Sequence, residues 1–232
     1  MLIKIISQLP KSVKTMLKPY FEFFSLLASS SESMAKIAFG KAIRVVQRPK
    51  FPCQDQGVFL NLGCGMTNHP KFINVDGFPY PHVHFVHRID RLPMFVDSSV
   101  DLIYASHCLE HFEYRHINEV LREWIRVLKP GGCIRLSVPD FDKLVAIYSD
   151  TGNPDDIVEQ IMGGQDNPYN FHYVLFNKKN LARYLIQAGF TDIHEWVPGS
   201  NDLTTFSDFS VYQKDTNGNK YEISLNLEAR KA

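Results

Sequence analysis

Five short apolar, β-branched-rich runs follow one another from residue 58 onward, separated by turn-forming residues. They lie at residues 58–62, 72–75, 83–86, 102–105 and 133–138. Nearly continuous runs of this kind are typical of strands that are covered on both faces. Two further strands are predicted at residues 191–197 and 222–229, the last one after the turn Asn217-Gly218. The pattern therefore predicts a buried central β-sheet.

Helical periodicity appears in two places between these strands. Six apolar residues share one stripe of a helix that stops at Lys129-Pro130-Gly131-Gly132: Ile117, Val120, Leu121, Trp124, Ile125 and Leu128. Asn177 and Gly189 are the residue types that begin and end a second helix. A strand, a helix and a further strand of the same sheet form a right-handed parallel crossover. We therefore predict an α/β fold that is doubly wound around a mainly parallel sheet.

Residues 10–28 carry a different pattern, in which apolar side chains recur at helical spacing and lysines occupy polar positions. This spacing predicts a basic amphipathic helix that is kinked or split at Pro19. The proline-containing linker 47–56 places a domain boundary, with an N-terminal helical extension over residues 1–50 and the main domain over residues 51–232. Such a helix more often packs on its own domain or on a partner subunit. Peripheral contact with an anionic membrane surface is the alternative.

Charge and cysteine usage narrow the expected setting. Lys and Arg together number 25, as do Asp and Glu. Nucleic acid is therefore not an expected partner, because no overall basic field is present to hold a phosphate backbone. The four cysteines contain no C-x-x-C pair, as in a reduced, cytosolic chain. We expect neither a secretion signal nor a transmembrane anchor, because the most apolar N-terminal window, residues 20–28, is short and contains Glu22. The expected location is cytoplasmic, with a membrane-peripheral location as the alternative.

Two glycines and an acid mark the ends of the first two predicted strands. Residues 58–62 run into Gly63-Cys64-Gly65, where the missing Cβ atoms let the backbone approach a ligand closely. The second strand ends at Asp76, whose carboxylate could accept hydrogen bonds from both hydroxyls of a ribose. The glycine pair alone also fits an ordinary tight turn, so the acid on the next strand is what favours a nucleoside site.

Five motifs then occur in order along the chain. They are Asn-Leu-Gly-Cys-Gly, an acid ending the second strand, Asp before Leu-Pro, Val-Asp-Leu-Ile-Tyr-Ala-Ser-His with Leu-Glu-His, and Leu-Lys-Pro-Gly-Gly. In this order they resemble the class I S-adenosylmethionine-dependent methyltransferases. The resemblance is closest to the small-molecule, methyltransferase type 11-like branch that often accompanies polysaccharide biosynthesis. It covers roughly residues 57–230 and implies a Rossmann-like, seven-stranded sheet with an antiparallel last strand.

The resemblance also implies which residues meet the cofactor, S-adenosyl-L-methionine. The implied contacts are Asn61, Gly63, Gly65, Asp76, Ile89, Asp90, Ser106 and His107. The glycines would lie against the methionine and ribose parts, Asp76 would hold the ribose hydroxyls, and Asp90 would meet the adenine amino group. Asn61 departs from the family, which usually has an acid there, and it supplies no counter-charge for the methionine amine. Asp76 follows Gly65 by 11 positions, whereas a dinucleotide site expects an acid about 20 residues on.

The expected activity is methyl transfer to a small-molecule acceptor, and the expected acceptor atom is an oxygen of a sugar or a glycoconjugate. Proximity and alignment of the acceptor with the S-methyl bond would supply most of the catalysis. A hydroxyl acceptor also needs a general base, for which His107, His111, His172 and Asp140 are the candidates. No metal is expected.

Two alternatives come from other classes of protein. His107, Glu110 and His111 match the H-x-x-E-H pattern of inverted zinc hydrolases. They nevertheless occupy the place of the methyltransferase Leu-Glu-His motif. The second alternative is a non-catalytic cofactor-binding or scaffold protein that docks through its N-terminal helix, and the altered Asn61 is its one support.

Overall fold

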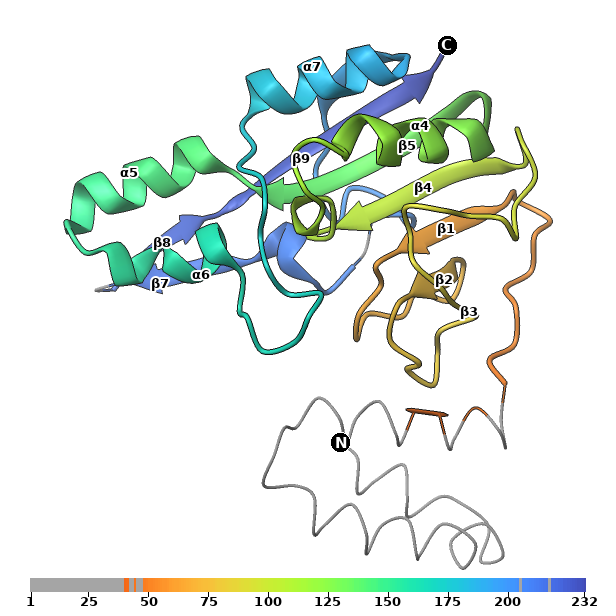
Figure 1. Ribbon diagram of the computed structural model, residues 1–232, viewed down its shortest axis with the longest axis horizontal. Coiled ribbons are helices and arrows are strands. Elements are labelled where there is room, and N and C mark those ends of the chain that lie inside the picture. Colours follow the sequence, from red (N-terminus) through yellow and green to blue (C-terminus); the bar gives the residue numbers. More distant parts are fainter. Residues whose placement is uncertain (1–39, 42–43, 45–47, 205, 217) are drawn as a thin grey trace, which may run out of the picture. The chain divides into compact units, whose positions relative to one another are not determined.

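The computed structural model describes residues 40–41, 44, 48–204, 206–216 and 218–232 (Figure 1). The chain divides into two units, residues 1–48 with 79–81 and residues 49–78 with 82–232. The predicted helix over residues 10–28 lies outside the described residues, as does most of the extension over residues 1–50. The second unit contains the sheet and every residue of the predicted site.

A seven-stranded sheet forms the centre of the second unit. Its strands are β1 (Phe59–Leu62), β2 (Ile73–Asp76), β3 (Phe85–Val86), β4 (Val100–Ser106), β5 (Leu128–Pro139), β6 (Phe190–Glu195) and β9 (Ser224–Lys231). The spatial order is β3-β2-β1-β4-β5-β9-β6, and only β9 runs antiparallel to its neighbours. This confirms the predicted mainly parallel sheet with an antiparallel last strand. The order reverses direction between β1 and β4, which is where open α/β sheets bind ligands.

Helices α4 (Ile117–Val127) and α7 (Lys178–Ala188) pack on one face of the sheet (Figure 1). Their apolar residues join the strands in one core cluster, in which Trp124 is fully buried. The predicted start and end of α7 are confirmed, because Asn177 forms a capping box with Asn180 and Gly189 takes a left-handed conformation. The apolar stripes of α4 and α7 are thus buried, and the two helices cover this face of the sheet.

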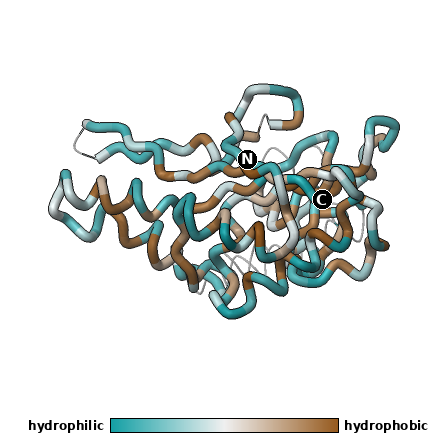
Figure 2. Tube along the Cα trace, turned by 90° about the horizontal axis from the view of Figure 1, so that it is seen from above, coloured by the Kyte–Doolittle hydropathy of each residue, from teal (hydrophilic) through white to brown (hydrophobic). Residues whose placement is uncertain are grey.

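The opposite face of the sheet carries a smaller, mainly aromatic cluster. Tyr104 of β4 stacks on Phe206 with ring centroids 3.8 Å apart, and Trp196 packs against Tyr104 at 5.8 Å. Figure 2 shows hydrophobic and hydrophilic stretches alternating along the chain, with many of the outer turns hydrophilic. No helix in the described ranges is both long enough and apolar enough to cross a bilayer.

Further elements surround the carboxyl ends of the strands. Helix α5 (Phe141–Thr151) follows β5, and α6 (Val158–Met162) follows α5. Short 3₁₀ turns η1 (Leu109–His111), η2 (Pro154–Asp156) and η3 (Phe209–Val211) lie in the connections. Strands β7 (Gln213–Thr216) and β8 (Asn219–Glu222) form a separate hairpin.

Several strand boundaries differ from the sequence prediction by one or two residues, as in β3, which begins at Phe85 rather than at residue 83. Two further differences involve neighbouring elements. The predicted stop at Lys129-Pro130-Gly131-Gly132 lies inside β5, which begins at Leu128. Leu128 pairs with Val100, and regular pairing resumes only at Cys133 opposite Leu102, so the intervening residues form a bulge. The last strand begins at Ser224 rather than at residue 222, because Glu222 belongs to the hairpin.

Candidate functional site

The turn after β1 is shaped by its two glycines. Gly63 and Gly65 have φ angles of 63° and 51°, which favour glycine. A Cβ on Gly63 would lie 2.7 Å from Cys108 Cβ, so packing also requires glycine there. A Cβ on Gly65, in contrast, would meet nothing within 4 Å. Gly65 therefore borders open space at the edge where a ligand is expected.

Asp76 closes the other side of this space at the end of β2. Its side chain is buried, one oxygen accepts the Gly65 N–H at 2.7 Å, and the other accepts the Phe78 N–H at 2.7 Å. Burial raises the pKa of the Asp76 carboxyl, and the two backbone N–H groups oppose that rise. Each carboxylate oxygen has a second lone-pair direction for a hydroxyl. The open space at Gly65 and these remaining acceptor positions fit the ribose of S-adenosylmethionine.

Asn61 lies one strand away from this carboxylate and is turned toward β2. Its amide donates to Asn74 Oδ1 at 3.1 Å, and Asn74 in turn donates to Asn68 Oδ1 at 2.8 Å. The Asn61 side chain is buried within this amide network. Its predicted contact with the methionine amine stays a prediction.

The segment after β3 contains the residues predicted to meet adenine. Ile89 is buried in the core, and its carbonyl accepts the Trp124 indole N–H at 2.6 Å. Asp90 pairs with Arg88 at 2.6 Å, and hydrogen bonds from that guanidinium lower the pKa of the Asp90 carboxyl. Asp90 lines a cavity of about 440 Å³ together with Phe112. Its predicted contact with the adenine amino group stays a prediction, and Arg88 would share the carboxylate.

His107 stands just beyond Ser106, at the end of β4, with an unusual backbone φ of 48°. Its Nδ1 lies 3.4 Å from Glu110 Oε1, and its Nε2 lies 2.8 Å from Ser224 Oγ. Ser224 donates its own hydrogen to the Phe209 carbonyl at 2.7 Å, so His107 is the donor toward Ser224. Both ring nitrogens of His107 are therefore engaged within the protein.

Glu110 is fully buried among three histidines. Burial acts to raise its pKa, but His107, His111 and His172 together hold the pKa of this carboxyl below its ordinary value. Donor atoms of Glu110, His111 and His172 lie within 4.8 Å of one another. The two His111 ring nitrogens, however, face the carbonyls of Phe171 at 3.0 Å and His107 at 3.2 Å.

The zinc-hydrolase alternative requires His107 and His111 as its two histidine ligands. The cluster of possible ligands contains His172 in place of His107, and His107 contacts Glu110 and Ser224 instead. The zinc-hydrolase alternative stays a prediction. His172 Nδ1 faces the Gln160 carbonyl at 2.9 Å, and burial lowers the pKa of that imidazole.

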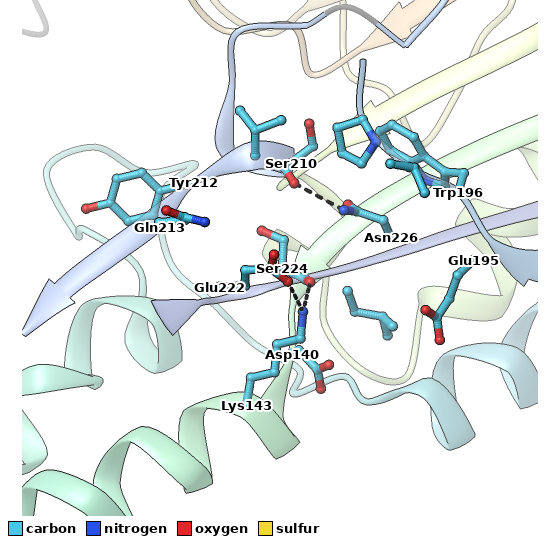
Figure 3. Close-up of a pocket in the computed structure, with 14 residues that line it drawn as sticks. Asp140, Lys143, Glu195, Trp196, Ser210, Tyr212, Gln213, Glu222, Ser224 and Asn226 are labelled. Atoms are coloured by element: carbon cyan, nitrogen blue, oxygen red, sulfur yellow. Dashed lines mark hydrogen bonds and ion pairs between the residues drawn. The ribbon is translucent and has the colours of Figure 1, made fainter. Parts of the chain in front are cut away.

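A cavity of about 460 Å³ opens at the carboxyl end of β5 (Figure 3). Side chains from several segments line it, among them Asp140, Lys143, Glu195, Trp196, Tyr212, Glu222, Ser224 and Asn226. Lys143 Nζ donates to the Ser224 carbonyl at 2.8 Å and lies 3.4 Å from Glu222 Oε2. The same Ser224 bonds His107, so the cavity adjoins the end of β4 where the cofactor is expected.

Asp140 is the one of the four general-base candidates that lines this cavity. It ends β5 and caps α5, because its Oδ1 accepts the Asp142 N–H at 3.1 Å. Burial raises the pKa of the Asp140 carboxyl, and the Asp142 N–H opposes that rise. A buried carboxylate with a raised pKa is a stronger base than an ordinary aspartate.

Comparison with known proteins relates part of the chain to a protein family. Residues 60–136 match the model of the methyltransferase domain family. The chain therefore contains a methyltransferase domain over these residues. The predicted family, enzyme class and methyl donor, S-adenosylmethionine, are thereby confirmed at this level. Docking through the N-terminal helix stays a prediction, because that helix lies outside the described residues. No curated protein matches the chain.

Solved methyltransferases resemble the chain at low sequence identity. A S-adenosylmethionine-dependent methyltransferase from Thermotoga maritima is 15% identical, with 95% of this chain and 99% of that chain covered and a TM-score of 0.49. The 1,6-didemethyltoxoflavin-N1-methyltransferase of Burkholderia thailandensis, solved with S-adenosylhomocysteine, is 16% identical over 95% and 87% of the two chains, with a TM-score of 0.48. A Methanosarcina mazei methyltransferase is 17% identical over 77% and 94%, also with a TM-score of 0.48.

Several residues of the methyltransferase domain's site were not predicted from the sequence. Ser224 and Trp196 reach the cavity from β9 and from just after β6, and Tyr212 reaches it from the segment before β7. None of them belongs to one of the five motifs. The hydroxyl of Ser224 inside the predicted strand 222–229 was the one available signal, and it does not distinguish a site residue from an ordinary strand residue.

Proposed function

We propose that the methyltransferase domain transfers the S-adenosylmethionine methyl group to a hydroxyl of a small polyhydroxylated acceptor, a sugar or the sugar part of a glycoconjugate. The observation that carries this proposal is the 460 Å³ cavity at the carboxyl end of β5, which contains Asp140 and adjoins His107 through Ser224. A cavity of this size accommodates a small ligand.

The lining of the cavity supports a sugar-like acceptor. Carboxylates and amides accept hydrogen bonds from hydroxyls, and Trp196 and Tyr212 supply aromatic surface for the apolar face of a sugar ring. Three carboxylates, those of Asp140, Glu195 and Glu222, stand against the single ammonium of Lys143. This balance disfavours a carboxylate or phosphate inside the cavity, so the reacting part of the acceptor carries no negative charge.

The chemistry needs one proton acceptor and two binding surfaces. When bound, S-adenosylmethionine supplies an electrophilic methyl group on a sulfonium. Asp76 and the Gly65 turn would hold its ribose, while the cavity would orient the acceptor hydroxyl. As the oxygen–methyl bond forms and the sulfur–methyl bond breaks, the Asp140 carboxylate takes the hydroxyl proton, and the products are the methyl ether and S-adenosylhomocysteine. His107, which contacts Glu110 and Ser224, would link the end of β4 to the cavity through Ser224.

The test is an acceptor screen that measures S-adenosylhomocysteine release. The full chain is incubated with S-adenosylmethionine and two panels of compounds, one of neutral sugars and glycosides and one of small amines without hydroxyl groups. Turnover with sugars, followed by mass-spectrometric detection of an O-methyl product, supports the proposal. Turnover confined to the amine panel would reject the hydroxyl acceptor and the need for Asp140 as a base.

A further inference from the structure

The segment between α6 and α7 forms a closed loop that is held by its own hydrogen bonds. The Gln165 N–H donates to the Asn170 carbonyl at 2.8 Å, and the Asn170 amide donates to Asp166 Oδ1 at 2.7 Å. The Tyr169 N–H donates to Asn167 Oδ1 at 2.9 Å. These bonds fix the backbone on either side of Tyr169, so the loop presents that ring in a defined position.

The loop is also anchored to the edge of the sheet that carries the site. The Tyr173 N–H donates to the Glu110 carbonyl at 2.9 Å, and His111 Nδ1 faces the Phe171 carbonyl at 3.0 Å. Glu110 and His111 belong to η1, which follows β4 directly. The loop is thereby tied to the same turn that carries His107.

Tyr169 lies beside the residues that are expected to hold the nucleoside. Its ring atoms come within 3.5 Å of a Cβ built on Gly77, the residue after Asp76. The ring packs edge-on against Phe78, with centroids 5.3 Å apart and an interplanar angle of 88°. Tyr169 also lies near enough to Arg88, the partner of Asp90, to interact with it electrostatically. The ring thus lies between the predicted ribose and adenine contacts.

Exposure and the glycine at position 77 indicate what this ring faces. Tyr169 is 52% exposed although it contacts Phe78 and Gly77. A Cβ on Gly77 would just touch the ring at 3.5 Å, so only a side chain larger than alanine would compete with the ring for this place. An aromatic ring held rigidly at such a place offers its free surface to a planar base.

We propose that Tyr169 forms the outer wall of the nucleoside pocket and packs against the adenosine part of S-adenosylmethionine. The interaction is made by the ring, and it depends on the loop hydrogen bonds that hold Tyr169 over Gly77. This inference rests on the cofactor assignment alone and is independent of the acceptor proposed above.

The experiment is calorimetric titration of S-adenosylhomocysteine and of adenosine into the full chain. Stacking of a base on an aromatic side chain predicts roughly 5- to 100-fold weaker binding of both ligands by Tyr169→Ala. Tyr169→Phe keeps the ring and is expected to bind within about twofold of the wild type. Tyr173→Ala is the matched control, because Tyr173 is 51% exposed and belongs to the same segment.

The outcomes distinguish a failure of the proposed role of Tyr169 from a failure of the cofactor assignment on which it rests. Wild-type binding with an unchanged affinity in Tyr169→Ala would overturn the role of the ring. An equal loss in Tyr173→Ala would also overturn it, since general loosening of the loop would then explain both variants. Gly77→Leu tests the same contact from the other side, because a large side chain there displaces the ring and is expected to weaken binding as Tyr169→Ala does. Failure of the wild type to bind S-adenosylhomocysteine would reject the cofactor assignment itself.

Discussion

Replacing Asp140 by asparagine separates its two roles, because the cap on α5 and the proposed proton acceptance use different properties of the side chain. The cap needs an oxygen that accepts the Asp142 N–H at 3.1 Å. Asparagine supplies that oxygen and is about as good a cap as aspartate. It is not, however, a base at neutral pH. Asp140→Asn therefore removes the proton acceptor and keeps the helix start.

The expected magnitudes differ between the two measurements. A positioned general base contributes about 10²- to 10⁴-fold to rate, so Asp140→Asn and Asp140→Ala should both lower kcat/KM by that order. Loss of the cap costs about 1 kcal/mol of unfolding free energy, so only Asp140→Ala should lose it in urea unfolding. Glu222→Gln, which changes another carboxylate of the same cavity, is the matched control and should keep the rate within a few-fold.

The pH dependence of Asp140 gives a second readout of the same variant. Burial raises the pKa of this carboxyl above its ordinary value of 3.8, and only the ionised form takes a proton. The rate of the wild type should therefore rise with pH through this raised pKa, and Asp140→Asn should lack that limb. Since the folded pKa lies above the unfolded one, the stability linked to the protonated form is present at low pH and is lost as pH rises through the folded pKa. An Asp140→Asn variant with wild-type activity would refute the assignment.

Two further substitutions test the frame around the cofactor site. Glu123→Gln removes the charge of a carboxylate that accepts the Leu92 N–H at 2.6 Å and pairs with Arg126 at 2.8 Å. It should lower the free energy of unfolding by about 1.5–3 kcal/mol at pH 7. Because Arg126 lowers the pKa of Glu123, this loss, measured by urea unfolding, should shrink as pH falls through that pKa, and an equal loss at pH 3 would contradict this. Gly63→Ala should lower the free energy of unfolding by about 2–4 kcal/mol, because the added Cβ is overpacked against Cys108 and the backbone is strained in its left-handed conformation. Gly65→Ala shares the backbone strain, but its Cβ would enter open space. Equal losses of the two variants in thermal unfolding would therefore contradict the packing argument.

Local sequence patterns were enough to predict the helix and strand ends that surround this site. Asn177 and Gly189 bound α7 as expected, because helix caps depend on residues within a few positions of one another. Gly63 and Asp76 lie at neighbouring strand ends because parallel strands share an edge, and the Gly65 N–H bonds Asp76 directly. Asp140 caps α5 by an equally local contact, with the N–H of Asp142.

Which residues line the site depends on contacts between segments that are distant in the sequence. Hydrophobic periodicity does not predict such contacts. Tyr169 meets Gly77 only because the loop folds back onto the sheet edge. Ser224 meets His107 because β9 inserts antiparallel beside β5. The hairpin of β7 and β8 was missed although its turn was predicted, since its strands are mostly exposed and carry few apolar residues.

Calorimetric titration of S-adenosylhomocysteine into the wild type and Asp76→Asn tests the cofactor site most directly. Asparagine keeps one oxygen for the Gly65 or Phe78 N–H but loses the charge that would hold the ribose hydroxyls. We expect saturable one-to-one binding by the wild type and roughly 10- to 100-fold weaker binding by the variant, as for lost hydrogen bonds to a charged group. A folded wild-type sample, free of co-purified ligand, that binds no S-adenosylhomocysteine would contradict the account.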